Sequence, residues 1–366
     1  MKKTLVALAV LGSFAGVASA ATSVTLYGTV DAGYEGWSYG KDFSSLNNTF
    51  VQGGTSEENS KIGVRGQEDL GNGLAAIFTL EGGIGADVGE TNAGQLFNRE
   101  STVGLKGSFG EVKIGSAKSQ MELALGGIVP GHRVADVDLY SVAMTRHSNG
   151  LFYSYDNAGF SFGADVTTKG GAAGNVDAAG NVTEGVTGEK VAYGARLGYT
   201  GQVGGNVTLL ARAAYQNDGT PVTVGTKTVK TQEWGGLLAA VVPFSNNSLT
   251  VGVAYAQGKG MASDLTDAKG LLAGRIPADK ARTLSAVVAA GFGSNDSAYL
   301  KYQQRKGSWN GVTTYNGNVW AAGYEHSLSK RTSVYADVAY ATIKNIGTVG
   351  LKGTATGYSV GLAHNF

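Results

Sequence analysis

The chain has 366 residues, a formal net charge of +1 and no cysteine. The near-neutral charge gives no electrostatic reason to expect a polyanionic partner such as nucleic acid, and the lack of cysteine excludes a disulfide framework and thiol-based metal or redox sites. Glycine supplies 58 residues, far above the usual share of about 7%, without the three-residue period of collagen. This composition indicates many turns and closely packed strands, and it suggests no resident cofactor.

Residues 1–20, MKKTLVALAVLGSFAGVASA, are predicted to be a secretory signal peptide. Two lysines precede an apolar run, and small residues end the segment, so cleavage is expected after Ala20. The apolar run is too short and too interrupted by glycine for a membrane anchor. No later segment reaches the roughly 18 consecutive apolar residues of a membrane-spanning helix. Residues 21–366 are therefore predicted to form a single domain of an exported protein.

Short alternating segments fill the rest of the chain, separated by clusters of Gly, Asn, Asp and Ser, and no helical period persists over three turns. Short and long connections take turns along the chain. The short connections are expected at 66–73, 107–111, 156–159, 201–206, 243–248, 292–297 and 327–331. The long ones are expected at 35–59, 83–96, 117–146, 168–189, 217–231, 258–281, 306–317 and 344–355. These fifteen connections predict sixteen strands with tight turns at one end and long loops at the other, which is the plan of an outer-membrane barrel.

Side-chain alternation supports the same fold. In residues 248–257, Leu249, Val251 and Val253 share one parity, and Thr250, Gly252 and Ala254 take the other. A soluble β-sandwich also alternates and remains the alternative, but small residues on the polar face suit a water-filled lumen better than sheet packing. Lipid offers no hydrogen-bond partners to the backbone groups at an open sheet edge. A sheet that spans the membrane must therefore close into a barrel. The predicted fold is all-β, a transmembrane antiparallel barrel of sixteen strands.

Six segments, in order, resemble the general-diffusion porins of Gram-negative bacteria, in the neisserial and β-proteobacterial group. They are SVTLYGTVDAGYE (23–35), SKIGVRGQEDLGNGLAAIFTLEGG (60–83), FNRESTVGLKGSFGEVKIGS (97–116), RHSNGLFYSYDNAGFSF (146–162), SLSKRTSVYADVAY (327–340) and GLAHNF (361–366). The resemblance covers nearly all of the mature chain. It implies a homotrimer of barrels in outer-membrane lipid, passive diffusion of ions and small hydrophilic solutes, and a third loop that folds inward to narrow each pore.

The segment 357–366, GYSVGLAHNF, is predicted to be the strand that closes the barrel against residues 23–34. Its alternation turns Tyr358, Val360, Leu362 and Phe366 toward lipid, where aromatic rings favour the bilayer interface. The resemblance implies that this pattern, with its terminal phenylalanine, is the signal recognised by the barrel-assembly machinery.

The pore wall follows from alternation, because the residues opposite each outward aliphatic side chain face inward. The inward charged residues predicted to line the constriction are Lys61, Glu81, Glu100, Lys113 and Arg146. Alternation also turns Asp31, Arg65, Lys106, Arg196 and Arg212 inward, with Arg65 and Lys106 near the periplasmic mouth. The resemblance supports Lys61 and Arg146, since family members often carry basic residues there. Ser116, Phe152 and Ala363 stand where basic residues are common, so the basic wall is expected to be thin.

The third loop, about 117–146, supplies an acidic side of the constriction: Glu122, Asp136 and Asp138. A loop of this length in a compact protein is usually functional. If it inserts, its carboxylates face Lys61, Lys113 and Arg146 and create a transverse field that sorts ions. Ordinary solvation on an extracellular loop is the alternative for each acid.

Functions other than a porin have little support in the sequence. The four histidines, His132, His147, His326 and His364, are scattered over the predicted barrel without metal-ligand spacing, so neither an enzyme nor a metal site is expected. A substrate-specific channel on the same barrel remains the alternative, because Tyr27, Phe152, Tyr299 and Tyr335 face inward by alternation. The preference for anions or cations is left open.

Overall fold

The computed structural model describes most of the chain beyond the predicted signal peptide. The described residues are 22–40, 48–52, 60–91, 96–126, 146–168, 175–176, 182–183, 191–204, 206–219, 222–224, 227–263, 276–346 and 352–366. No helix among them has the length and hydrophobicity that a membrane crossing by a helix requires.

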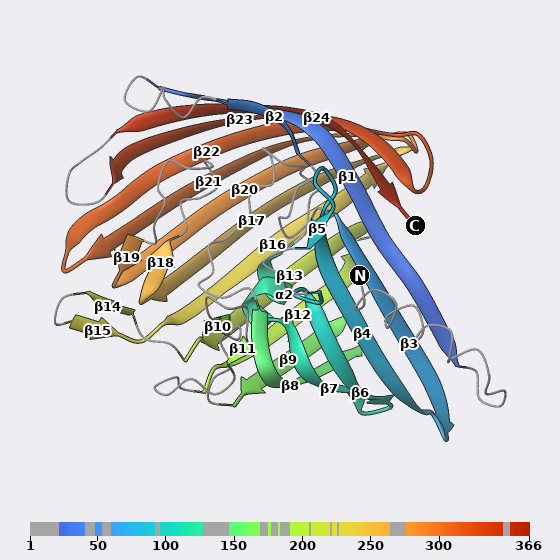
Figure 1. Cartoon of the computed structure of the whole chain (residues 1–366). Helices are drawn as coiled ribbons and strands as arrows, with labels where there is room; N and C mark the ends of the chain where they lie inside the picture. Colours follow the sequence, from blue (N-terminus) through green and yellow to red (C-terminus); the bar gives the residue numbers. More distant parts are fainter. Residues whose placement is uncertain are drawn as a thin grey trace.

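Sixteen long antiparallel strands within these residues form one continuous wall (Figure 1). In chain order they are β1 (Ser23–Tyr39), β3 (Lys61–Gly71), β4 (Leu74–Gly85), β6 (Glu100–Gly107), β7 (Gly110–Lys118), β8 (Arg146–Asn157), β9 (Phe160–Thr167), β12 (Tyr193–Val203), β13 (Val207–Asn217), β16 (Gln232–Phe244), β17 (Asn247–Lys259), β20 (Lys280–Phe292), β21 (Asp296–Trp309), β22 (Val312–Ser327), β23 (Thr332–Ile346) and β24 (Gly353–Asn365). Each strand pairs with the next one in this order. Because β1 also pairs with β24, the wall closes into a barrel.

Shorter elements lie within the long connections between these strands. They are β2 (Asn48–Gln52), β5 (Glu90–Thr91), α2 (Gln120–Leu125), β10 (Asn175–Val176), β11 (Val182–Thr183), β14 (Val222–Val224), β15 (Lys227–Val229), β18 (Met261–Ser263) and β19 (Ile276–Ala278). Strands β2 and β5 extend the barrel sheet at β1 and β4, and the other short strands form separate two-stranded ribbons.

The connection predicted as long at 306–317 is instead a two-residue turn, so that expectation was wrong. Strand β21 continues to Trp309 and β22 starts at Val312, with Asn310 (φ 51°) and Gly311 (φ 79°) between them. Asn72 (φ 55°) and Gly73 (φ 76°) form the β3–β4 turn in the same way. Asn-Gly favours this left-handed geometry, whose twist matches that of the flanking strands. The polar residues that indicated a loop belong to the strands, where water in the lumen tolerates them.

Strand β24 confirms the predicted alternation and closure. Tyr358, Val360 and Leu362 are 45–51% exposed on the outer face, whereas Ser359 on the inner face is only 1% exposed. The pairing with β1 runs from Thr29 opposite Asn365 to Tyr39 opposite Ala355. Beyond it, the amide of Phe366 donates to the carbonyl of Gly28 at 3.1 Å. The last residue therefore belongs to the seam of the barrel.

Aromatic side chains pair on the outer face near both ends of the barrel. Phe160 and Tyr199 (ring centroids 4.8 Å apart) lie next to a short turn. Trp234 and Tyr255 (5.6 Å) lie toward the long connections. Two such levels of rings match the girdles that flank the apolar band of an outer-membrane barrel.

The start of the third loop lies against the inner face of the wall. Helix α2 begins after Ser119, whose hydroxyl accepts from the Glu122 amide. Its buried residues Met121, Ala124 and Leu125 form an apolar cluster with inward residues of β13, β16, β17 and β20, including Leu237 and Val287. In Figure 1, α2 lies beside β12, β13 and β16. A six-residue helix is too short to give a periodic signal in the sequence. Residues 127–145 lie outside the described part, so inward folding of the whole loop stays a prediction.

Candidate functional site

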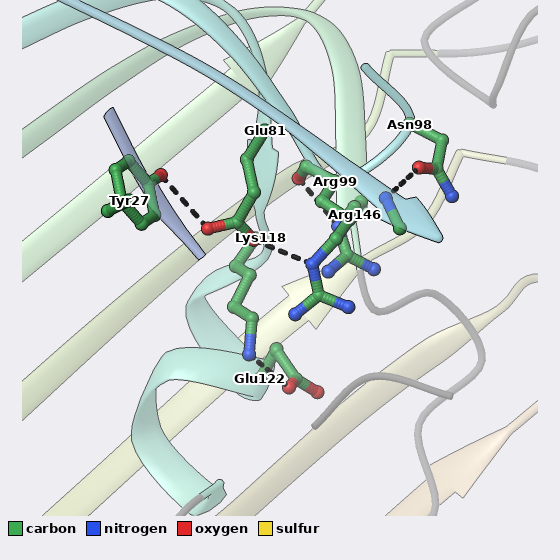
Figure 2. Close-up of polar contacts among 8 residues, drawn as sticks. Tyr27, Glu81, Asn98, Arg99, Lys118, Glu122 and Arg146 are labelled. Carbon is green, nitrogen blue, oxygen red and sulfur yellow. Dashed lines mark hydrogen bonds and ion pairs between the residues drawn. The ribbon is translucent and has the colours of Figure 1, made fainter. Parts of the chain in front are cut away.

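A cluster of charged side chains gathers where β4, the segment before β6 and α2 meet inside the barrel (Figure 2). The Glu81 carboxylate accepts hydrogen bonds from the Tyr27 hydroxyl at 2.9 Å and from Nε of Arg99 at 2.6 Å. The Arg99 side chain is only 5% exposed and that of Glu81 is 16% exposed. A buried guanidinium requires a nearby carboxylate, so this pair fixes the position of both groups.

Arg146 and α2 complete this charged cluster, which we define as Glu81, Arg99, Lys118, Glu122 and Arg146. Nε of Arg146 donates to the Arg99 backbone carbonyl at 2.7 Å. Lys118 and Glu122 pair at 3.1 Å across one turn, Nζ to Oε1. Figure 2 shows Arg146 beside Arg99, and Lys118 reaching toward Glu122. The start of the third loop is thereby placed against the wall by charge as well as by apolar packing.

A second charge pair borders the cluster. Glu100 lies directly opposite Glu81 on the neighbouring strand, and like charges in that position destabilise a sheet. Each carboxylate has its own cation, because Nζ of Lys113 contacts Glu100 at 2.9 Å. The Thr102 hydroxyl also donates to Glu100, at 2.9 Å. The two acids therefore coexist as two separate pairs.

The predicted constriction residues are thus partly assembled. Glu81, Glu122 and Arg146 lie in one cluster, and Glu100 and Lys113 form the adjacent pair. Lys61 is the first residue of β3 and is half-buried. Asp136 and Asp138 lie outside the described residues. The roles of all these residues in selectivity remain predictions.

Sequence reasoning missed Arg99 and Lys118. Alternation from Val103 puts Arg99 on the outward parity, but β6 begins only at Glu100, so the rule does not apply one residue earlier. Lys118 is the last residue of β7, directly before the N-cap Ser119 of α2, so the strand alternation does not decide its direction. Such strand ends have no reliable signature in a single sequence.

A bulge in β8 buries His147, which sequence reasoning left without a role. Three steps from Gly150 to His147 pair with two steps from Gly115 to Ala117, and Asn149 (φ 53°) lies within the bulge. His147 is fully buried, with Nδ1 2.5 Å from Oδ2 of Asp165 and Nε2 3.6 Å from Oδ1 of Asp218. These groups connect β8, β9 and the residue after β13. Within the described ranges no group of histidine and carboxylate side chains has the geometry of a metal site.

Tyr27, Phe152, Tyr299 and Tyr335 are confirmed as inward-facing. The hydroxyls of the three tyrosines donate to carboxylates of the wall. Tyr335 donates to Asp31 at 2.7 Å, and Tyr299 donates to Asp337. Phe152 is 5% exposed. With the Tyr27–Glu81 bond, three of the four inward aromatics belong to hydrogen-bonded networks of the wall.

A closed antiparallel barrel with an apolar outer face, a charged inner face and a helix inside it defines a membrane channel of the porin class. The family model described as Gram-negative porin matches residues 7–346. The chain is 30% identical over its full length to two full-length relatives, outer membrane porin protein 32 of Delftia acidovorans and major outer membrane protein P.IB of Neisseria lactamica. An anion-selective porin from Comamonas acidovorans superimposes with a TM-score of 0.62 at 25% identity, over 94% of this chain and 100% of that one. The chain belongs to the Gram-negative porin family.

Proposed function

We propose that this protein is an outer-membrane porin through which ions and small hydrophilic solutes diffuse passively. The observation that carries this function is the separation of faces around a closed ring: apolar side chains outside and charged side chains inside. Such a wall leaves no edge exposed to lipid and keeps a polar route through it. The full-length relatives, named as outer membrane porins, support the same conclusion. Passive diffusion changes no covalent bond of the solute, so no enzyme activity is proposed.

The selectivity of the pore is proposed to arise at the charged cluster. Lys61 and Lys113, which lie outside the cluster, form the basic side of the constriction with Arg146, while Glu122 belongs to the acidic side together with the predicted loop residues Asp136 and Asp138. Glu81 and Glu100 belong to the wall and balance their cationic partners. Fixed charges in a narrow, low-dielectric passage bias which ions enter. The support is that Glu122 of α2 and Arg146 of β8 lie in the same charged cluster (Figure 2).

A general-diffusion pore is favoured over a substrate-specific channel. A solute track needs aromatic faces and polar groups that are available to the solute. The hydroxyls of Tyr27, Tyr299 and Tyr335 instead bond to carboxylates of the wall. Saturable block by one neutral solute, such as a disaccharide, with no effect of other sugars, would favour the specific channel.

Assembly and export are proposed to follow the family. Residues 1–20 would be removed on export, and Tyr358, Val360, Leu362 and Phe366 would present the closing strand to the barrel-assembly machinery. The outward position of these four side chains supports this role. The mature barrel is proposed to be a homotrimer, which chemical crosslinking in detergent would reveal as a ladder ending at three subunits.

Planar-bilayer recording tests the function and the constriction together. The purified protein should insert in discrete conductance steps that grow in proportion to salt concentration. In a potassium chloride gradient, the double variant K61E/R146E should shift the reversal potential toward cation preference, because two wall charges change sign. R282E is the matched control, since Arg282 is exposed on the outer parity of β20 with Leu284. Equal reversal potentials for wild type and K61E/R146E would refute the assignment of these residues.

A further inference from the structure

A second polar region of the lumen lies away from the charged cluster. It is a cavity of about 470 Å³ between α2 and the turn that joins β8 to β9. Its lining includes Leu123, Asp156, Ser161, Arg196, Thr200 and Arg212. The cavity thus combines two guanidinium groups, one carboxylate and two hydroxyls within reach of the lumen.

The two arginines are neighbours on the inner face. Arg196 of β12 lies opposite Ala214, and Arg212 of β13 lies opposite Gly198, so the arginines occupy diagonal positions on adjacent strands. Side chains at such positions start about 7–8 Å apart, which long side chains easily bridge. Leu197, on the opposite parity, is 64% exposed on the outer face. Both guanidinium groups therefore project toward the same space.

Two glycines make room for these side chains. A Cβ on Gly163 would lie 2.2 Å from Oε1 of Gln120 and 2.7 Å from Nε of Arg196. A Cβ on Gly198 would lie 2.4 Å from Oγ of Ser161 and 3.5 Å from Cγ of Arg212. Any larger residue at Gly163 or Gly198 would displace the polar groups that line the cavity. The absence of side chains at Gly163 and Gly198 therefore leaves the space in which Arg196 and Arg212 lie along the wall.

One arginine is held in position while its outer nitrogens stay available. Nε of Arg196 donates to Oε1 of Gln120 at 3.0 Å, and Gln120 is a buried residue of α2. This bond orients the guanidinium fork and uses only one of its five donors. In the part of the chain that the structure describes, neither Arg196 nor Arg212 forms an ion pair within 4.0 Å, unlike Arg99.

Asp156 opposes the arginines at the edge of the cavity. Asp156, Ser161, Gly198 and Arg212 form one cross-strand row, with the charged residues at its ends. The carboxylate reduces the net positive charge to one and therefore weakens anion binding. Weak binding suits a channel, because a solute must leave the site as readily as it enters.

We propose that Arg196 and Arg212 form a transient binding station for small oxyanions, meaning solutes with a phosphate, sulfate or carboxylate group. A planar guanidinium fork matches two oxygens of such a group, whereas chloride offers a single charge without that geometry. Ser161 and Thr200 supply hydroxyl donors for the remaining oxygens. The station deepens the proposed function and rests on it, since a solute reaches the cavity only through an open pore.

The test measures how inorganic phosphate affects chloride current through the full-length mature protein in planar bilayers, at constant ionic strength. Wild type should show a saturable fall in conductance. R212Q and R196Q should each raise the half-saturating phosphate concentration roughly ten-fold, the loss expected for one charge-assisted hydrogen bond. R212K keeps the charge without the fork and should give a smaller rise. R282Q, on the outer face, should behave as wild type.

The outcomes separate the station from the channel. The half-saturating concentrations of sulfate and acetate should rise in R212Q as that of phosphate does, because the recognised feature is the oxyanion. Normal chloride conductance, with no saturable phosphate effect or with equal effects in wild type and R212Q, would overturn the station and leave the porin function standing. Absence of any conductance from the folded protein would overturn both.

Discussion

The charged cluster and the oxyanion station use the same residue types on the same inner wall, yet their charges are arranged differently. In the charged cluster, Arg99 has Glu81 at 2.6 Å and Lys118 has Glu122 at 3.1 Å. In the station, two arginines share a cavity with one carboxylate. Paired charges hold a loop against a wall, because each partner satisfies the other. Cations without an ion-pair partner remain available to a passing solute.

Apolar packing of α2 connects these two regions, and its loss should have the largest effect. Leu125 is fully buried against Leu237 and Val287. Leu125→Ala should lower the local stability of α2 by roughly 3 kcal/mol through lost transfer energy and a cavity. Hydrogen exchange of residues 120–126 would measure this change as faster exchange. Leu123→Ala, at a position 40% exposed on the same helix, is the matched control and should change exchange much less.

Breaking a buried pair in the charged cluster should cost less, because lumen water relieves part of the penalty. Glu81→Gln removes the carboxylate that contacts the buried Arg99 and should destabilise the barrel by roughly 2 kcal/mol. Unfolding in denaturant, followed by circular dichroism, gives the free energy. Lys106→Gln removes a more exposed pair, Lys106–Glu111, whose side chains are 52% and 30% exposed. It should change stability by less than about 1 kcal/mol. Equal losses in the two variants would contradict the distinction between buried and exposed pairs.

A charge pair outside the sixteen barrel strands is the most solvent-exposed case of this comparison, and its loss should show the smallest effect. Nζ of Lys227 contacts Oδ2 of Asp279 at 2.6 Å and Oδ1 of Asn310 at 2.7 Å, and the Asn310 amide donates to Asp279 at 2.8 Å. Partial burial alone would raise the pKa of Asp279, but these hydrogen bonds and the charges of Lys227 and Lys280 outweigh it and lower the pKa.

The lowered pKa fixes the sign of a pH effect. A carboxyl group with a lower pKa in the folded state contributes stability that is fully present above its unfolded value, about 3.9, and that is lost as pH falls through the folded value. Hydrogen exchange at the β21–β22 turn should therefore accelerate between pH 5 and strongly acidic buffer, beyond the intrinsic change in exchange rate. Asp279→Asn should remove this extra dependence. A variant with the same pH profile as wild type would show that Asp279 does not restrain the turn.

The barrel was predictable because its signals are local and repeated. Alternation in segments such as 248–257 and 357–366 fixes which face meets lipid, and tight-turn residues mark the short connections. The one wrong connection, 306–317, combined an Asn-Gly turn with polar strand residues. Polar strand residues resemble a loop in sequence, because the inner face of a water-filled barrel accepts them. The pattern of a single segment does not distinguish the two.

The candidate site was only partly predictable. Alternation places Glu81, Lys113 and Arg146 on the inner face, but it gives no information about partners. Arg99 precedes its strand, Lys118 ends β7, and His147 is separated from the rest of β8 by a bulge, so each lies where the two-residue period fails. That Glu81 and Glu100 lie opposite each other, each with its own cation, depends on cross-strand register, which no single segment contains.

The sequence by itself determined the side-chain faces, the approximate strand number and the family, since all three depend on patterns within ten to twenty neighbouring residues. Only the tertiary structure decided which charges are paired and which stay available. Strand register and the packing of α2 against the wall bring together residues as distant in sequence as Gln120 and Arg196. The electrostatic interaction between side chains depends on their distance in space and not on their separation in sequence.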